Sequence, residues 1–299
     1  MNPLINYNSA RELRAFLEER GLGMRKKFGQ NFLINPSTRS MLFDELDLEA
    51  GEGVWEIGPG LGAMTAGLLE REGRVTAFEI DPAFCRILRE FFSSNDGFQL
   101  IEGDVLKTWP MLGDSGSELL LGNLPYNIAA TVLADFIEKS RYFKRIVVTV
   151  QSEVARRMAG RPGTKDYSSF SVLCSSVYKV TLLAIIKGSS FYPAPNVESR
   201  AVRLDLLRDS DPPDSFFYKT VRALFSGRRK KIKNTLSAYT SSLIMGEKQG
   251  SSLQAAAQQA AMGALDACGI SGDRRAETLE REEFLALSAS LKEIVLNES

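Results

Sequence analysis

The sequence predicts an α/β protein in which a Rossmann-like, largely parallel sheet is followed by a smaller, all-helical C-terminal domain. Three observations lead to this prediction. Short apolar runs alternate with helical stretches, a glycine-rich turn follows the first of these runs, and only helical patterns occur after residue 208. The 299 residues suffice for one large or two moderate domains at roughly 150 residues each. A composition of 44% hydrophobic and 25% charged residues is typical of soluble globular proteins and does not support collagen-like, disordered or membrane-spanning classes.

The first predicted element is a helical extension over residues 1–24. Ser9 and Glu12 have the spacing of a capping box, and Leu13 and Leu17 fall on one helical face. The first 30 residues contain no apolar run long enough for a secretory signal, and their acidic residues argue against a mitochondrial presequence. We therefore expect a short amphipathic helix and a cytoplasmic protein.

The predicted sheet domain spans residues 25–208. Short apolar runs typical of strands lie at 54–57, 75–80, 98–101, 119–121 and 146–150. The connections between them are long enough for crossover helices, which predicts a parallel sheet covered on both faces. Two later runs, 178–187 and 201–207, have no helical segment between them. They are expected to form an antiparallel pair at one side of the sheet.

The last predicted domain, 209–299, begins with a polar, proline-bearing linker at 209–214. Only helical patterns follow it, including an alanine-rich stretch at 254–264.

The glycine turn, residues 58–62, lies between the first strand of the sheet and the next helical stretch. Glycines there allow a sharp turn and a close approach of the backbone to a ligand. Glu79 lies about 20 residues after the turn begins, where a carboxylate can accept both hydroxyls of a ribose. Asp104 and Asn123 follow the next two strands, so polar side chains gather at the ligand-binding edge of the sheet. This predicts a nucleoside-containing cofactor, with NAD and S-adenosylmethionine both open at this point.

The fourth strand ends in Asn123-Leu124-Pro125-Tyr126, which resembles the Asn/Asp-Pro-Pro-Tyr/Phe signature of methyltransferases that modify exocyclic amines of adenine. Such an amine is a poor nucleophile because its lone pair is delocalised into the ring. The Asn123 side-chain oxygen and the Leu124 carbonyl can accept the two amine hydrogens and localise that pair. Tyr126 offers a flat face to an extruded base, a contact worth about 1–3 kcal/mol. The motif favours S-adenosylmethionine.

Four further segments strengthen the resemblance. They are 27–33, 151–167, 191–197 and 225–231. Together with the glycine turn and the Asn123 motif, they occur in the order found in ribosomal RNA adenine dimethyltransferases, and the resemblance covers roughly residues 11–240. It implies an S-adenosylmethionine-dependent methyltransferase domain over 25–208. It also implies dimethylation of two adjacent adenines in small-subunit (16S) ribosomal RNA, a step of ribosome biogenesis.

Carried over residue by residue, the resemblance implies two sets of site residues. The cofactor would be contacted by Asn31, Leu33, Gly58, Glu79, Asp104 and Asn123. Within this set, Glu79 would hold the ribose and Asp104 the adenine amine of the cofactor. The target adenine would be positioned by Asn123, Leu124, Tyr126 and Phe191, with Phe191 stacking on the face opposite Tyr126.

The net charge is zero, with 37 basic and 37 acidic residues, so RNA binding is predicted only from local clusters. The predicted RNA-binding residues are Arg25, Lys26, Lys27, Arg156, Arg157, Arg228, Arg229, Lys230 and Lys231. Clusters of this kind neutralise phosphates and bind RNA in a salt-sensitive way. The expected partners are the small ribosomal subunit and its 16S ribosomal RNA, with a monomeric protein and no membrane.

The residue types also exclude some chemistry. With no histidine, Ser-His-Asp and Cys-His nucleophile systems and histidine-containing zinc sites are impossible. Cys85, Cys174 and Cys268 are too few and too far apart for a cysteine-only zinc site or a disulfide framework, so no metal is expected. Three alternatives stay open: an erythromycin-resistance type methyltransferase of large-subunit ribosomal RNA, a non-catalytic ribosome-assembly factor on the same fold, and an NAD-dependent dehydrogenase.

Overall fold

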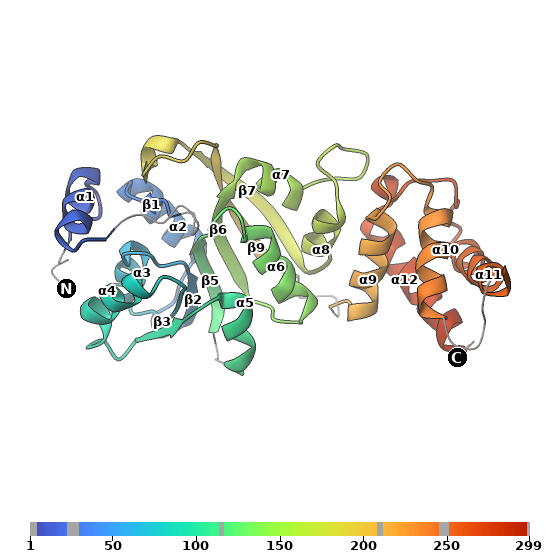
Figure 1. Cartoon of the computed structure of the whole chain (residues 1–299), viewed down its shortest axis with the longest axis horizontal. Helices are drawn as coiled ribbons and strands as arrows, with labels where there is room; N and C mark the ends of the chain where they lie inside the picture. Colours follow the sequence, from blue (N-terminus) through green and yellow to red (C-terminus); the bar gives the residue numbers. More distant parts are fainter. Residues whose placement is uncertain (1–4, 23–29, 114–116, 208–211, 245–250, 298–299) are drawn as a thin grey trace. The chain divides into compact units, whose positions relative to one another are not determined.

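The computed structural model describes residues 5–22, 30–113, 117–207, 212–244 and 251–297, and it contains two compact units (Figure 1). The sheet unit comprises Met1–Phe136, Arg141–Arg156 and Lys179–Leu206. The helical unit comprises Ile137–Ser140, Arg157–Tyr178 and Leu207–Ser299. The helical unit thus includes residues 157–178 as well as the C-terminal segment, and the domain boundary at 208 stays a prediction.

The main sheet has seven strands in the order β4-β3-β2-β5-β6-β9-β7. The strands are β2 (Gly53–Ile57), β3 (Arg74–Glu79), β4 (Phe98–Glu102), β5 (Ser117–Asn123), β6 (Arg145–Gln151), β7 (Tyr178–Ile186) and β9 (Ser199–Leu206). The first five run parallel to one another, and β9 is antiparallel to its neighbour β6. All five predicted parallel strands are confirmed, and the two later runs are neighbours in the sheet. In this order β3 lies on one side of β2 and β5 lies on the other, so the strand order reverses at β2. Ligands bind at such a switch point in sheets of this type.

Some helices pack against this sheet, and others follow it in the chain and belong to the helical unit. The helices are α1 (Ala10–Glu19), α2 (Pro36–Leu46), α3 (Ala63–Leu69), α4 (Pro82–Phe92), α5 (Val105–Thr108), α6 (Ala129–Glu138), α7 (Ser152–Met158), α8 (Ser169–Val177), α9 (Ser215–Phe225), α10 (Ile232–Leu243), α11 (Ser251–Ala267) and α12 (Arg281–Asn297). Leu42, Leu46 and Leu68 of α2 and α3 form one buried cluster with Val54 and Leu121 of the sheet. Every residue of β2 is buried, as expected for a strand covered on both faces.

A second, two-stranded sheet joins distant segments. β1 (Phe32–Leu33) pairs antiparallel with β8 (Phe191–Tyr192), with Leu33 opposite Phe191. The sequence did not predict this sheet because strands of two residues have no measurable periodicity. The pairing brings the segment around Asn31 next to the strand that contains Phe191.

Helix α1 belongs to the sheet unit. Its N-cap is Ser9, whose hydroxyl accepts the Glu12 N–H at 3.2 Å, as predicted. The reciprocal half of the predicted capping box is wrong, because the Glu12 carboxylate accepts from the Asn6 amide at 3.0 Å instead. Leu13 and Leu17 are buried in a cluster that also contains α4 side chains, so α1 packs on the sheet unit.

The helical unit is built around α9 to α12, and the predicted helical character of the C-terminal segment is confirmed (Figure 1, orange to red). The rings of Phe225 and Phe284 stack with centroids 5.8 Å apart. Tyr167 joins residues 157–178 to this core. Its hydroxyl donates to the Leu279 carbonyl at 2.9 Å, and its ring meets Phe225 edge-on.

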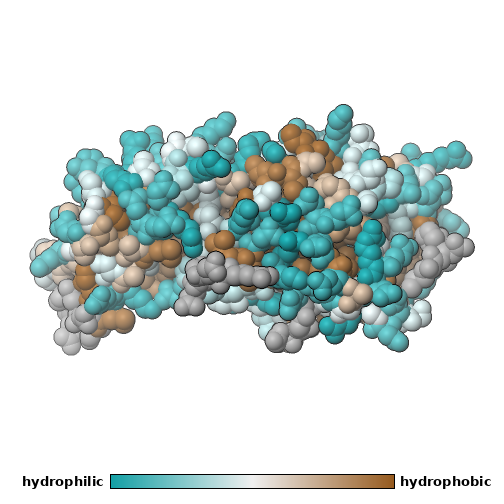
Figure 2. Space-filling model, turned by 180° about the vertical axis from the view of Figure 1, so that it is seen from behind, coloured by the Kyte–Doolittle hydropathy of each residue, from teal (hydrophilic) through white to brown (hydrophobic). Residues whose placement is uncertain are grey.

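Most of the face in Figure 2 carries hydrophilic residues, with hydrophobic residues in separate groups. The large hydrophobic side chains that are exposed among the described residues are Ile80, Met111, Ile185, Val197 and Leu296. In the part of the chain that the structure describes, no helix is both long and apolar enough to cross a membrane.

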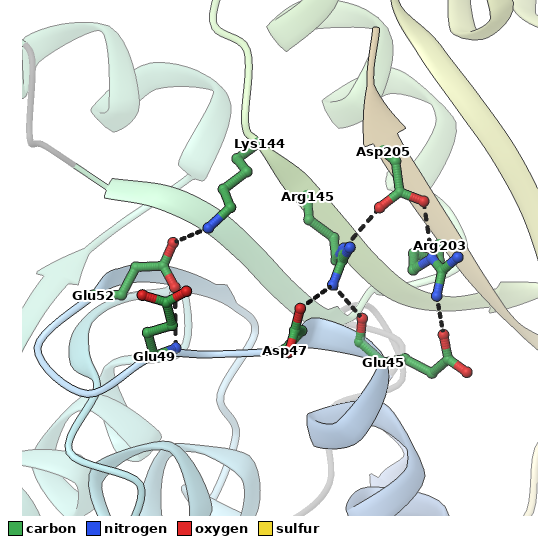
Figure 3. A network of polar contacts seen from close by, with 8 residues as sticks. All are labelled: Glu45, Asp47, Glu49, Glu52, Lys144, Arg145, Arg203 and Asp205. Carbon is green, nitrogen blue, oxygen red and sulfur yellow. Dashed lines mark hydrogen bonds and ion pairs between the residues drawn. The ribbon is translucent and has the colours of Figure 1, made fainter. Parts of the chain in front are cut away.

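A network of ion pairs ties β6 and β9 to the end of α2 (Figure 3). Asp205 lies opposite Arg145 in the β6–β9 register and accepts from Arg145 Nε at 2.7 Å and from Arg203 Nε at 2.9 Å. Arg203 Nη1 also donates to Glu45 Oε2 at 2.7 Å, and Arg145 Nη1 donates to Asp47 Oδ2 at 3.1 Å. Asp205 therefore pairs with both arginines.

Replacing Asp205 with alanine is expected to lower the free energy of unfolding by about 1–3 kcal/mol, because two half-buried guanidinium groups lose a charged partner. The midpoint of urea unfolding measures this change. Glu18→Ala is the control, because Glu18 pairs with Arg14 on the exposed surface of α1 and its removal should leave the midpoint nearly unchanged. Equal shifts for the two variants would contradict the expected role of the network.

Candidate functional site

One pocket opens at the carboxyl ends of β2, β3, β4 and β5. It is lined by all the residues predicted to contact the cofactor, namely Asn31, Leu33, Gly58, Glu79, Asp104 and Asn123. These residues come from separate strands and from the segment before α2. The structure brings them together at the edge that the strand order marks for ligands. Their contacts with a cofactor stay a prediction.

The glycine turn forms one wall of the pocket. Gly58, Gly60 and Gly62 have φ angles of 69°, 59° and 86°, in the left-handed region that favours glycine. A Cβ on Gly62 would lie 2.4 Å from a ring carbon of Phe92, so this position has no space for a side chain. The Gly60 N–H donates to Glu79 Oε2 at 3.1 Å, which joins the turn to the end of β3.

The Glu79 carboxylate is held at two points and is almost fully buried. Its Oε2 accepts from Gly60 N, and its Oε1 accepts from the Asp81 N–H at 2.8 Å. Burial raises the pKa of Glu79 to about 7, although both backbone N–H groups favour the charged form. Each oxygen keeps a further lone pair for a ligand. The group is therefore preoriented and changes its charge near neutral pH.

Glu56 is a buried carboxylate that sequence reasoning did not single out. It lies in β2, and its Oε2 accepts from the Thr65 hydroxyl at 2.6 Å, while Oε1 has no hydrogen-bond partner among the described residues. Burial raises the pKa of Glu56 to about 7. The available signal was an acidic residue inside the apolar run 54–57.

Glu56→Gln is expected to stabilise the protein at pH 8 and to have little effect at pH 5. The folded pKa lies above the ordinary value, so the folded protein holds a proton that the unfolded chain releases, and stability falls as pH rises from about 4.5 to 7. The side-chain amide of glutamine resembles the neutral carboxylic acid, so the variant does not lose stability in this way. The difference in the free energy of unfolding is on the order of 3 kcal/mol at pH 8. Urea unfolding at both pH values measures it. The exposed Glu19→Gln is the control, and no gain for Glu56→Gln at pH 8 would contradict the expectation.

The amide of Asn123 is bonded on both sides at the end of β5. Its Nδ2 donates to the Asn31 carbonyl at 2.6 Å, and its Oδ1 accepts from the Thr149 hydroxyl. The neighbouring Leu124 N–H donates to the Thr149 carbonyl at 3.1 Å. Thr149 was not singled out in the sequence, where its only signal is a polar residue within the apolar run 146–150.

The other residues predicted to position the target base do not line the pocket. The Leu124 side chain is buried, and Tyr126 is half-buried with its hydroxyl 2.5 Å from the Ser199 hydroxyl. Phe191 is 3% exposed and packs in the hydrophobic cluster that contains Leu33. The stacking role of Phe191 stays a prediction, and it requires a face of this ring to become accessible.

The N-terminal segment contributes pocket residues that the sequence did not predict. Tyr7 and Leu13 line the pocket, and the Tyr7 hydroxyl donates to the Leu61 carbonyl at 3.0 Å. The segment therefore contacts the glycine turn directly. No local pattern around Tyr7 indicates this contact, because it joins residues 54 positions apart.

The predicted RNA-binding residues have different surroundings. Arg25, Lys26 and Lys27 lie outside the described residues. On α7, Arg156 is exposed and Arg157 is half-buried.

The cluster 228–231 is partly neutralised within the helical unit. Arg228 pairs with Glu277 at 3.0 Å, and Lys231 pairs with Asp273 at 3.0 Å. Arg229 and Lys230 are exposed and form no ion pair with another described residue. These two are the cations of the cluster most available to a phosphate.

The cysteines and acidic residues form no metal site among the residues with described placement. Cys85 and Cys174 are buried, Cys268 is half-buried, and all three are free thiols. No group of three or more cysteine, aspartate or glutamate side chains there could hold a metal ion.

Comparisons with known proteins show which family of proteins this chain is similar to. A family model described as ribosomal RNA adenine dimethylase matches residues 21–290. A protein of Treponema denticola named ribosomal RNA small subunit methyltransferase A is 45% identical over 95% of this chain and 94% of its own length. The protein of the same name from Treponema pallidum is 41% identical over 97% of this chain and 99% of its own.

Two solved structures show the same fold. A dimethyladenosine transferase from Plasmodium falciparum has a TM-score of 0.72 and 22% identity, covering 87% of this chain and 97% of that chain. The 23S rRNA methyltransferase ErmE has a TM-score of 0.60 and 23% identity, covering 87% of this chain and 99% of that chain. These likenesses confirm the predicted α/β fold with its Rossmann-like sheet.

Proposed function

Because the chain belongs to the ribosomal RNA adenine dimethylase family, we propose that it dimethylates the exocyclic amines of two adjacent adenines in small-subunit (16S) ribosomal RNA. The methyl donor is S-adenosylmethionine, and the reaction is a step of ribosome biogenesis in the cytoplasm, carried out by a monomer. The observation that carries the proposal is the single pocket that combines the glycine turn, Glu79 and Asp104 with the Asn123 amide.

The pocket residues fit a nucleoside cofactor. Gly58 and Gly60 line the pocket without a side chain, so the backbone of the turn can approach a ligand closely. The two oxygens of Glu79 can each accept one hydroxyl of a ribose. Ile80 is 45% exposed and provides apolar surface for a flat ring beside Glu79. Asp104 uses one oxygen to cap α5 through the Leu106 N–H at 3.1 Å, which leaves the other oxygen for an amine.

When bound, S-adenosylmethionine supplies an electrophilic methyl group on a sulfonium. Asn123 Oδ1 and the Leu124 carbonyl accept the hydrogens of the target amine and localise its lone pair toward that methyl group. Tyr126 supports the flat base. The protein thus contributes position and hydrogen-bond acceptors. No strong general base is needed, since a methylated aromatic amine is acidic and loses its proton to solvent.

RNA binding in this proposal depends on exposed basic side chains. Arg229 and Lys230 meet the phosphate backbone, together with Arg156 on α7. Because phosphate neutralisation releases counterions, the affinity for RNA falls with rising salt concentration. The target base is recognised by the Asn123 motif, not by these cations.

The proposal is tested with the purified full chain, isotopically labelled cofactor, and small and large ribosomal subunits that lack methylation. The expected result is label in 16S ribosomal RNA, recovered as dimethyladenosine at two adjacent positions. Label in the large subunit would instead indicate an erythromycin-resistance type enzyme. Absence of cofactor binding in calorimetry would indicate a non-catalytic assembly factor, and nicotinamide-dependent activity would indicate a dehydrogenase.

A further inference from the structure

We propose that Thr149 is a positioning residue that sets the orientation of the Asn123 amide for methyl transfer. The proposal rests on the proposed function, because Asn123 is the residue that would accept a hydrogen of the target amine. It assigns a role to a buried hydroxyl on β6, a strand that otherwise only supports the site.

The hydrogen bonds of Asn123 determine which way its amide points. The Asn31 carbonyl, 2.6 Å from Nδ2, can only accept, so the nitrogen of the amide must face it. Oδ1 therefore faces the Thr149 hydroxyl, which donates a hydrogen bond to it. In the reverse orientation, Oδ1 would meet the Asn31 carbonyl oxygen, and two acceptors would repel each other.

Thr149 is placed for this role by the sheet. It is the register partner of Asn123 in the parallel pairing of β5 and β6, and it is 0% exposed. A buried hydroxyl has no water as an alternative partner, so its bond to Oδ1 is retained. The carbonyl of Thr149 also accepts the Leu124 N–H at 3.1 Å. One residue thus holds both members of the acceptor pair, Asn123 with its side chain and Leu124 with its backbone.

The arrangement leaves the acceptor capacity that the reaction needs. An amide oxygen has two lone pairs, and Thr149 occupies one of them. The second can accept from the target amine without any reorganisation of the side chain. Loss of the hydroxyl would leave Oδ1 without its buried donor and the amide held only through the bond from Nδ2 to the Asn31 carbonyl. Its remaining freedom to tilt affects the alignment of the reacting atoms more than the binding of either substrate.

Two matched pairs of variants separate the hydroxyl from the volume of the side chain. Thr149→Val has nearly the same shape without the hydroxyl, and Thr149→Ser keeps the hydroxyl without the methyl group. Thr149→Ala differs from Thr149→Ser by the hydroxyl alone. We expect Thr149→Val and Thr149→Ala to lower kcat about 10- to 100-fold. The KM for RNA and the Kd for the cofactor should change less than about threefold, and Thr149→Ser should keep kcat within about threefold of the wild type.

A second readout does not require turnover. In protein labelled with ¹⁵N at asparagine side chains, the Asn123 amide signal, assigned by its absence in Asn123→Ala, should be slow to exchange in the wild type and in Thr149→Ser. It should exchange faster or broaden in Thr149→Val. Circular dichroism and thermal unfolding show whether each variant is folded.

The outcomes distinguish the two proposals. If the wild type methylates adenine and Thr149→Val keeps a wild-type kcat, the role of Thr149 is wrong while the proposed function stands. If Thr149→Ser is as impaired as Thr149→Ala, the position acts through packing and the role of the hydroxyl is likewise wrong. If the wild type does not methylate RNA, the proposed function fails, and the amide signal alone decides whether Thr149 orients Asn123.

Discussion

Asn123→Ala is expected to lower kcat for methyl transfer by about 100- to 1,000-fold, the usual loss when a preorganised hydrogen-bonding group in an active site is removed. The variant loses the acceptor that localises the lone pair of the target amine, and the Leu124 carbonyl alone cannot replace it. It also loses the bond that joins β5 to the Asn31 carbonyl. Cofactor binding should weaken but persist, because Glu79 and the glycine turn are untouched. Single-turnover kinetics with labelled cofactor and calorimetry measure the two effects separately.

The matched control is Asn127→Ala, four positions further along the chain in the turn after β5. Asn127 is exposed and does not line the pocket, so its removal should change neither kcat nor the Kd for the cofactor by more than about twofold. Turnover at the wild-type rate in Asn123→Ala would refute the role assigned to its side chain.

Glu79→Ala is expected to raise the Kd for S-adenosylmethionine about 100-fold or more. Two hydrogen bonds from ribose hydroxyls to a charged group are together worth about 3 kcal/mol or more. The variant also releases the backbone N–H groups of Gly60 and Asp81, so the glycine turn loses its tie to β3. Isothermal titration calorimetry with the purified protein measures the loss.

The same carboxylate predicts how cofactor affinity depends on pH. Hydroxyl donors favour the ionised form of Glu79, and the pKa of this group in the free protein is about 7. Affinity should therefore be constant above pH 8 and fall by up to about tenfold per pH unit below 7. Glu79→Gln should bind weakly and lack this dependence.

Glu102→Ala is the control for both measurements. Glu102 lies opposite Glu79 in the β3–β4 register, but it pairs with Arg89 at the surface and does not line the pocket. Its removal should leave cofactor affinity and its pH dependence unchanged. A loss of affinity in Glu102→Ala as large as that in Glu79→Ala would show that the effect is one of general charge and not of a ribose contact.

Local patterns were sufficient to predict the parallel strands and the residues that follow them. Strands β2 to β6 are short apolar runs, and the carboxyl ends of parallel strands meet at one edge, so Gly58, Glu79, Asp104 and Asn123 had to converge there. The order of the motifs was sufficient to identify the family, and the comparisons confirm that family. These features depend on residues close together in the chain or on strand order alone.

Other features were set by contacts between distant residues and had no local signal. The pairing of Leu33 with Phe191 buries a ring that the resemblance assigns to the target base. The N-terminal segment adds Tyr7 to the pocket, although its pattern predicted only an amphipathic helix.

The sequence by itself determined which residues stand at the ligand-binding edge and which reaction they favour. Only the tertiary structure decided how those residues are held and charged. Burial of Glu56 and Glu79 raises each pKa to about 7 because the surrounding side chains exclude water from carboxylates that look ordinary in the sequence. The β5–β6 register places the hydroxyl of Thr149 against the Asn123 amide, and register is a property of two strands that neither strand carries alone.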